Sequence, residues 1–361
     1  MKIYCIKVDA LPFCQEVLQI QNLVSGALLR QVGGVFTTSS LIQMFTGKLS
    51  SDYEPQGVGY HLFKKKRDKN GVPNWTWMNE YIQFYLHDKG FDCIERNQGM
   101  IMDECLGFSK YPNLYSERTT PWDQHDNKSY KYLREQGKEW EESRDDEFRW
   151  IDKTKEAKGN IFYFINYSHF HSVISTVESK HKKYHKIAGE NVLEILGHYD
   201  FNEPDSLFWI FSDHGAWHHP HLGKFPLPEH FYTWAIVKDN TKEPLTFPNK
   251  IISMQDFPMF IRSKFGSPIQ QFPKDRIFLT EDGRQAVRRE VMTTAIACQF
   301  PEPNKMDCLL YHICLNRYLL RESVFEKGGL VIETKVKSPK SSKSFGILRK
   351  ALRENFDWVT K

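Results

Sequence analysis

Apolar, β-branched runs that lie far apart along the chain constrain the fold more than any other feature. They cover residues 3–8, 161–166 and 206–211, and a shorter run covers 234–237. Segments with helical spacing of apolar residues lie between them; residues 13–31 are the first. Strands that alternate with helices predict an α/β fold with a mostly parallel sheet and helices on both faces.

Two further helices and one further strand follow from local signals. Ser39 or Ser40 is suited to cap a helix that stops at Gly47, because a serine hydroxyl can accept from the first amides and glycine tolerates the conformation after the last turn. Residues 75–89 predict another helix, and residues 91–94 a strand.

The pattern changes beyond about residue 275. Short apolar runs at 295–300 and 309–314 indicate a small antiparallel unit, and a Lys/Ser-rich segment covers 335–343. We therefore expect an α/β domain over residues 1–275 and a small C-terminal α+β subdomain over 276–361.

Composition excludes several classes of protein. In 361 residues, 40% are hydrophobic and 26% charged, which is normal for a globular protein. The net charge of +4 comes from basic residues spread along the chain, whereas a nucleic-acid binder concentrates them, so we expect no nucleic-acid partner. No stretch approaches the roughly 20 apolar residues that cross a bilayer. Nothing in the sequence indicates an oligomeric state.

The expected location is cytoplasmic. The first apolar run is short and interrupted by charge, unlike a signal peptide. The seven cysteines are scattered, odd in number and without a CxxC pair, which favours a reducing compartment.

Polar side chains follow the predicted strands where each strand ends. Asp9 follows the first strand, His169 and His171 follow the second, and Asp213-His214 follow the third. Ligands of open α/β sheets collect at the carboxyl ends of the strands, so these residues could meet there. A carboxylate and an imidazole suit a divalent metal. The alternative for Asp213-His214 is a helix-capping aspartate beside a surface histidine.

These residues also carry a family resemblance. In content and order, residues 3–265 resemble the sulfatase branch of the alkaline phosphatase superfamily. The matching segments are Val8-Asp9, Thr37–Gly47, Asn166–His171, Phe211–Gly215 and Ser253–Pro258. In the last of these we expect Asp256 to be structural, as a cap of the loop before Phe257-Pro258.

The resemblance implies a role for each matching residue. One divalent ion (zinc, manganese, calcium or magnesium) would be held by Asp9, Thr37, Asp213 and His214. Thr37 also stands at the position of the nucleophile. His171 corresponds to the histidine near the leaving group, and Lys224 to the lysine that contacts the transferred group.

Several assignments stay open at this stage. Thr38 is the alternative nucleophile, since the register of the TTSS run is uncertain by one residue. His169 could bind a second metal, contact substrate or be structural. His219 or His221, in the cluster after Gly215, could hold a second metal, the alternative being surface residues of a loop.

Departures from the family pattern favour phosphorus over sulfur. Thr37, Ser39 and Leu41 fill the C-x-P-x-R frame from which sulfatases make formylglycine, and Ala10 stands where many carry a metal-binding aspartate. The resemblance therefore implies a metal-dependent hydrolase of phosphate or phosphonate esters, on a small-molecule or glycan substrate, through a covalent threonine. The alternatives are a phosphoryl-group transferase that resembles the phosphoethanolamine transferases, and a non-catalytic binding protein of the same fold.

Overall fold

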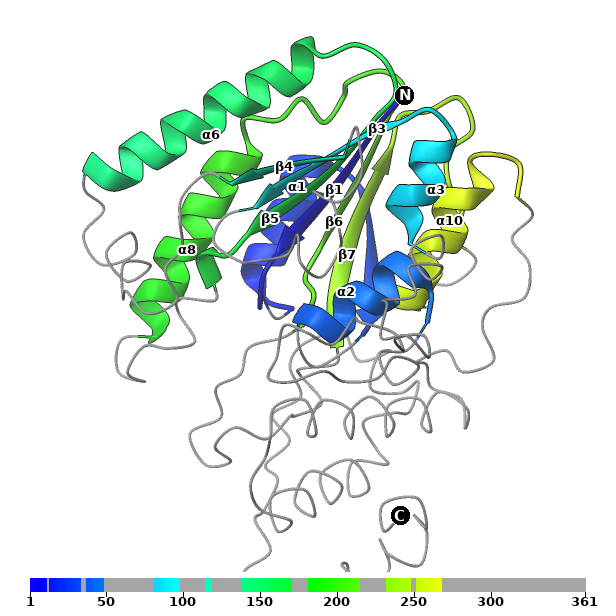
Figure 1. Cartoon of the computed structure of the whole chain (residues 1–361). Helices are drawn as coiled ribbons and strands as arrows, with labels where there is room; N and C mark the ends of the chain where they lie inside the picture. The colour runs from blue at the N-terminus through cyan, green and yellow to red at the C-terminus, as the bar shows by residue number, and fades with distance from the viewer. Residues whose placement is uncertain are drawn as a thin grey trace, which may run out of the picture.

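The structure is a computed structural model, and its described residues are 1–11, 13–33, 37–48, 81–97, 114–118, 138–170, 181–214, 232–247 and 251–267. They form one eight-stranded sheet with helices packed against it (Figure 1). The C-terminal subdomain expected over 276–361 lies outside the described residues, so that boundary stays a prediction.

The sheet is mostly parallel, as the alternation of strands and helices predicts. Its order is β4-β3-β5-β1-β6-β7-β2-β8. The central strand β1 pairs in parallel with β5 and β6, and β7 runs antiparallel to both of its neighbours. The strands are β1 (Lys2–Val8), β2 (Ala27–Val32), β3 (Asp92–Asn97), β4 (Leu114–Arg118), β5 (Ile161–Tyr167), β6 (Ser206–Phe211), β7 (Tyr232–Asp239) and β8 (Ile251–Ser253).

Helices cover both faces of the sheet, which confirms the expected α/β architecture (Figure 1). One face packs against α1 (Gln15–Val24), α6 (Lys138–Glu156) and α8 (His181–Leu196). The other packs against α2 (Thr37–Thr46), α3 (Ile82–Asp88) and α10 (Phe257–Ser263), which follows the short 3₁₀ helix η5 (Met254–Asp256). None of the described helices is long and apolar enough to span a membrane.

Alternation along β1 builds the two cores. Ile3 and Cys5 point to the face of α2, while Tyr4 and Ile6 point to the face of α1. All four are buried, as a strand with neighbours on both faces requires. The stretch at the start of the chain is therefore the middle of the sheet.

One sequence-based expectation about the elements is wrong. The helix expected over residues 13–31 ends at Val24, and the remainder is strand β2. Ser25 adopts a left-handed conformation with φ 53°, which stops the helix. Gly26 then lies so close to β7 that a Cβ would be 2.8 Å from the carbonyl oxygen of Val237. Because glycine lacks that atom, the chain can join β7 and gain sheet hydrogen bonds.

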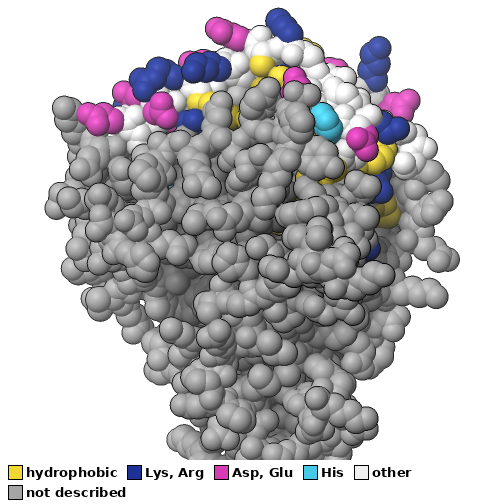
Figure 2. All heavy atoms as spheres, in the orientation of Figure 1, with side chains coloured by type: hydrophobic (Ala, Val, Ile, Leu, Met, Phe, Trp, Pro, Cys, Tyr) yellow, Lys and Arg dark blue, Asp and Glu magenta, His cyan; other side chains and the backbone are white. Residues whose placement is uncertain are grey.

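The surface over α6 carries both signs of charge. Figure 2 shows dark-blue and magenta side chains side by side along the upper edge of the molecule, where α6 lies in Figure 1. Lys155 pairs with Asp152 at 2.8 Å, one turn away on the same helix. Such pairs are typical of a solvated helix face.

Substitution of Trp209 tests the core on the face of the sheet that packs against α2. Trp209 is fully buried, and its ring lies 4.9 Å from that of Phe257. We expect Trp209→Ala to lower the free energy of unfolding by about 3–5 kcal/mol, because a large cavity replaces the ring. Leu18→Ala, at a side chain that is 44% exposed, should change it by less than about 0.5 kcal/mol. Denaturant unfolding followed by far-ultraviolet circular dichroism measures the free energy of unfolding of both variants. Equal losses in the two variants would contradict this core.

Candidate functional site

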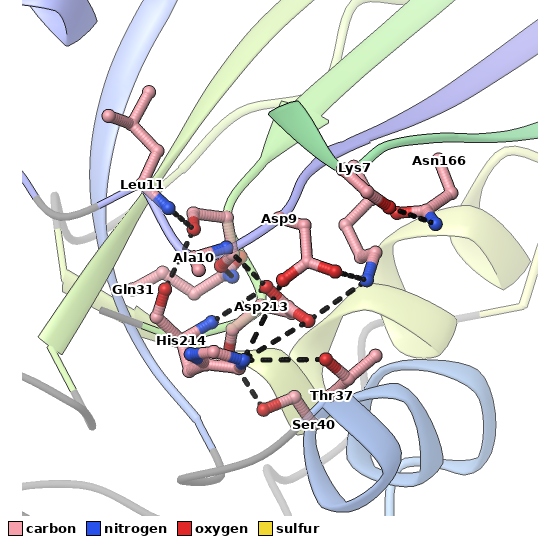
Figure 3. Close-up of polar contacts among 12 residues, drawn as sticks. Lys7, Asp9, Ala10, Leu11, Gln31, Thr37, Ser40, Asn166, Asp213 and His214 are labelled. Atoms are coloured by element: carbon pink, nitrogen blue, oxygen red, sulfur yellow. Dashed lines mark hydrogen bonds and ion pairs between the residues drawn. The ribbon is translucent and has the colours of Figure 1, made fainter. Parts of the chain in front are cut away.

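Five polar side chains meet at the carboxyl edge of the sheet. Asp9 follows β1, and Asp213 and His214 follow β6, which pairs with β1. Thr37 is the first residue of α2, and Lys7 lies near the end of β1. Figure 3 shows these side chains converging on one point. All five are buried, so the strand ends expected from the sequence do meet.

Backbone geometry after β1 fixes Asp213. Ala10 has φ 58°, a left-handed conformation that is uncommon without glycine. This turn directs the amide of Ala10 to Asp213 Oδ1 at 3.1 Å, and the amide of His214 donates to the same oxygen at 3.0 Å. At the position where many sulfatases carry a further aspartate, this chain therefore contributes a backbone N–H.

A serine on α2 places the threonine at the site. Ser40 Oγ donates to the carbonyl oxygen of Asp213 at 2.7 Å, which ties the first turn of α2 to the end of β6. Thr37 Oγ1 then lies 3.3 Å from His214 Nε2. The sequence predicts that Ser39 or Ser40 caps the helix. The observed contact of Ser40 is instead with the backbone carbonyl of Asp213.

Lys7 is the residue that the sequence analysis missed. Its ammonium lies 3.0 Å from Asp9 Oδ2 and 3.0 Å from Asp213 Oδ2, and all three side chains have no exposed surface (Figure 3). A signal was present, since a lysine inside an apolar strand two residues before Asp9 points to the same face as that aspartate. Its partner Asp213 follows β6, and only the pairing of β6 with β1 brings that carboxylate close.

The Asp213 carboxylate and the Lys7 ammonium stabilise each other's charge. Burial acts to raise the pKa of Asp213, but Lys7, His214, Thr37 and the Ala10 amide together lower it below the ordinary value. Burial acts to lower the pKa of Lys7, but Asp213 and Asp9 raise it above the ordinary value. The lysine is therefore charged, and the Asp213 carboxyl ionised, at neutral pH.

The charges and donors fit a divalent cation. Two buried carboxyl groups share the single ammonium of Lys7, and a buried negative charge without a partner is costly. Asp9 Oδ1 accepts no hydrogen bond among the described residues, and its recorded contact is with His214 Nε2 at 3.7 Å. Ligand atoms of Asp9, Asp213 and His214 all lie within 4.8 Å of one another. Carboxylate oxygens with an imidazole nitrogen suit zinc or manganese.

The other predicted site residues fall into two groups. His169 follows β5, and the centre of its ring lies 6.2 Å from that of Tyr167. Burial lowers the pKa of His169 to about 4. The metal-type cluster of described residues consists of Asp9, Asp213 and His214, without His169. His171, Lys224, His219 and His221 lie outside the described residues, and so does the side chain of Thr38. Their roles stay predictions.

Asp256 has the expected structural role. Its Oδ2 accepts from the Ser253 amide at 2.7 Å, and the Ser253 hydroxyl accepts from the Gln255 amide, so the two residues form a capping box. Gln255 Nε2 donates to the carbonyl oxygen of Gly47 at the end of α2. This segment thus supports the helix that carries Thr37.

Comparison with known proteins gives likenesses in structure only. No protein-family model matches the chain, and no curated protein is similar to it in sequence. A solved structure described as a protein in the alkaline phosphatase superfamily from Vibrio parahaemolyticus is 13% identical, with a TM-score of 0.46 over 73% of this chain and 66% of that one. This likeness is one of overall structure, and the threonine nucleophile expected from the sequence stays a prediction.

Two further similar structures come from other bacteria. The C-terminal periplasmic domain of EptC from Escherichia coli is 10% identical, with a TM-score of 0.45 over 76% of this chain and 84% of that one. The phosphonate monoester hydrolase of Agrobacterium radiobacter is 12% identical, with a TM-score of 0.44 over 73% of each chain.

The expectation of a cytoplasmic location is wrong by this comparison. The similar EptC structures are periplasmic domains, which points away from the cytoplasm. The expectation rested on the short apolar run at the start of the sequence and on the cysteines. That run is the central strand β1, whose composition reflects burial, so it carries no information about the compartment.

Lys7→Met should destabilise the protein in the absence of metal. We expect the free energy of unfolding to fall by about 3–5 kcal/mol in the presence of a chelator, because two buried carboxylates lose their counter-charge. Combining Lys7→Met with Asp213→Asn should cost less than the sum of the single changes, since the second removes one stranded charge. Urea unfolding measures all three variants.

Lys186→Met is the matched control. Its ammonium pairs with Glu190 at 3.7 Å on the surface, with the lysine side chain 78% exposed. Such pairs contribute at most about 1 kcal/mol. Strictly additive effects of the Lys7 and Asp213 changes would refute a shared charge cluster.

Proposed function

We propose that this chain is a metal-dependent hydrolase of phosphate or phosphonate esters that acts through a covalent intermediate on Thr37. One observation carries the proposal: the Thr37 hydroxyl lies 3.3 Å from His214 Nε2, beside the buried carboxylates of Asp9 and Asp213. A hydroxyl next to a metal-type ligand set is the arrangement that nucleophilic catalysis by threonine requires.

Four side chains are proposed to hold the cation: Asp9, Asp213, His214 and Thr37. A divalent ion supplies charge that favours ionisation of a bound hydroxyl and neutralises ester oxygens. The donor set supports this assignment, because Asp9 Oδ1 is buried, accepts no hydrogen bond among the described residues and faces His214. Asp9 and Asp213 also share a single ammonium, that of Lys7, which favours a further cation beside them.

Thr37 is proposed to attack phosphorus in line. Its Oγ forms a bond to phosphorus as the bond to the leaving oxygen breaks, and the alcohol departs with a proton. Water then cleaves the phospho-threonine, restoring the hydroxyl and releasing the acid. Thr37 begins α2, whose first backbone amides are suited to bind the oxygens of the transferred group. The resemblance assigns protonation of the leaving oxygen to His171 and contact with the transferred group to Lys224.

Lys7 supports a site for a single ion. It contributes a permanent positive charge that Asp9 and Asp213 share, so one divalent cation leaves this buried trio with a net positive charge. That balance suits an anionic ester, and a second cation would raise the repulsion further.

Phosphorus esters are favoured because the nucleophile is threonine. Threonine cannot be converted to formylglycine, the aldehyde that ordinary sulfatases hydrate and use. A threonine alkoxide attacks phosphoryl centres without such a modification. Comparing nitrophenyl phosphate, a nitrophenyl phosphodiester and nitrophenyl sulfate tests this choice, and faster turnover of the sulfate would overturn it. Product analysis with an added alcohol separates hydrolysis from transfer.

Thr37→Ala should abolish turnover and keep the metal. We expect kcat to fall by at least about 1,000-fold, because the nucleophile is gone while both carboxylates and the imidazole remain. Turnover of nitrophenyl phosphate and metal content by elemental analysis measure the two properties. Thr38→Ala, one residue along α2, is the matched control. Loss in that variant with full activity in Thr37→Ala would move the nucleophile to Thr38.

Asp213→Asn should release the metal. We expect affinity for zinc or manganese to fall by at least about 10-fold, since an amide replaces an ionised ligand. Titration calorimetry on protein stripped with a chelator gives the affinity and the stoichiometry, expected as one ion for the Asp9 site. Asp152→Asn, on the exposed face of α6, is the control. Unchanged affinity in Asp213→Asn would refute the ligand set.

A further inference from the structure

A second set of metal-type donors lies between α1 and α8, separate from Asp9 and its neighbours. Cys14 precedes α1, Glu16 is in the first turn of that helix, and His185 is on α8. One ligand atom from each lies within 4.8 Å of the others. His185 Nδ1 and Glu16 Oε1 are 3.3 Å apart.

We propose that Cys14, Glu16 and His185 form a binding site for a zinc-class divalent ion that joins α1 to α8. A thiolate, an imidazole and a carboxylate are donors that zinc accepts together. Bonds of about 2.0–2.3 Å at tetrahedral angles place neighbouring ligand atoms about 3.5 Å apart. The nitrogen–oxygen separation already has this size, so small rotations of side chains complete the set.

The surrounding packing brings the three side chains together. Gly189 lies one turn after His185 on α8, and a Cβ there would be 2.8 Å from Glu16 Cγ. The missing side chain therefore makes the space through which Glu16 reaches the histidine. The ring of Phe170 lies 5.0 Å from the ring of His185 and packs against it. Two elements that are distant in sequence thus shape one small site.

Exposure leaves room for the ion and for a water ligand. The side chain of His185 is 28% exposed and that of Glu16 is 22% exposed. An ion can therefore enter from solvent, and three protein donors leave a fourth tetrahedral position open. The contact also differs from an ordinary ion pair. His198, which follows α8, pairs with Asp152 of α6 at 3.0 Å, and among the described residues no cysteine joins that pair in a metal-type cluster.

Binding of an ion at this site should release the proton of the Cys14 thiol. The hydrogen bond from His185 lowers the pKa of Glu16 to about 2, despite partial burial, so the carboxylate is ready to bind. Burial and the neighbouring Glu16 raise the pKa of the Cys14 thiol well above its ordinary value. The thiol must lose its proton to become a ligand, so affinity should rise with pH.

The donors also predict a selectivity different from that of the first site. Thiolate favours zinc and cobalt over magnesium and calcium, whereas the Asp9 site offers mostly oxygen. Cobalt(II) is therefore a suitable probe, because a cobalt–thiolate bond gives a charge-transfer band in the near ultraviolet that an oxygen and nitrogen site lacks. The proposal does not depend on the function proposed above.

The experiment is a cobalt titration of the full chain, stripped of metal and kept reduced. We expect a thiolate band that saturates with one ion, survives Asp213→Asn and is displaced by zinc. Cys14→Ser should abolish the band and lower zinc affinity at this site by at least about 100-fold, because loss of a ligand costs more than loss of an outer partner. Calorimetry in buffers of different ionisation enthalpy should show release of about one proton.

Matched variants make the outcome decisive. His185→Gln should also remove the band, and His198→Gln, which disrupts a comparable imidazole–carboxylate pair, should leave it intact. His185→Gln serves in addition if Cys14→Ser fails to fold. A band that persists in His185→Gln and Cys14→Ser would assign it to another cysteine and overturn the proposal. So would the absence of any band in the native chain at a large excess of cobalt.

Discussion

The buried ammonium of Lys7 between Asp9 and Asp213 is the interaction on which the candidate site depends. Two carboxylates at the end of adjacent parallel strands would repel each other across a dry interior. Lys7 offsets that repulsion with two contacts of 3.0 Å and leaves one negative charge to be balanced. The sheet can therefore hold two carboxyl groups side by side, and the proposed cation would complete the balance of charge at the same point.

The rest of the architecture places a hydroxyl beside this charge cluster. β2 sits beyond the antiparallel strand β7 in the sheet, yet it runs in the direction of β1, so the chain that leaves it enters α2 at the same edge. Ser40 fastens the first turn of α2 to the carbonyl of Asp213. The capping box at Ser253 and Asp256 supports the other end of α2 through Gln255 and Gly47. Thr37 is positioned by these contacts rather than by its own hydrogen bond alone.

The two helical layers contribute different kinds of side chain to the two candidate sites. The layer of α2, α3 and α10 carries Thr37 and fills its core with aromatic rings, among them Phe45, Trp209 and Phe257. The layer of α1, α6 and α8 holds the pair Glu16–His185 with Cys14 beside it, and there the inferred zinc-class ion would join two helices. Oxygen-rich donors in one place and a thiol with an imidazole in the other separate the two sites by metal preference as well as by position.

Much of the fold followed from the order of strands and helices along the chain. Apolar runs long enough to be buried on both faces have few alternatives to central parallel strands, and the polar residues after them had to share one edge. Their positions after the strands were therefore enough to predict that Asp9, Asp213 and His214 meet. The helix expected over residues 13–31 failed because apolar residues in β2 fit either period, and close packing of Gly26 on β7 decided between them.

Contacts between segments that are distant along the chain could not be predicted from the sequence. Lys7 reads as an interruption of an apolar strand until β6 brings Asp213 within 3.0 Å of it. Glu16 and His185 are 169 positions apart, and only the packing of α8 on α1, with no side chain at Gly189, brings them together. The sequence determined which residues end each strand and point to its carboxyl edge, since that depends on local periodicity. The tertiary structure decided which charges are shared, because charge pairing depends on distances across the sheet and between helices.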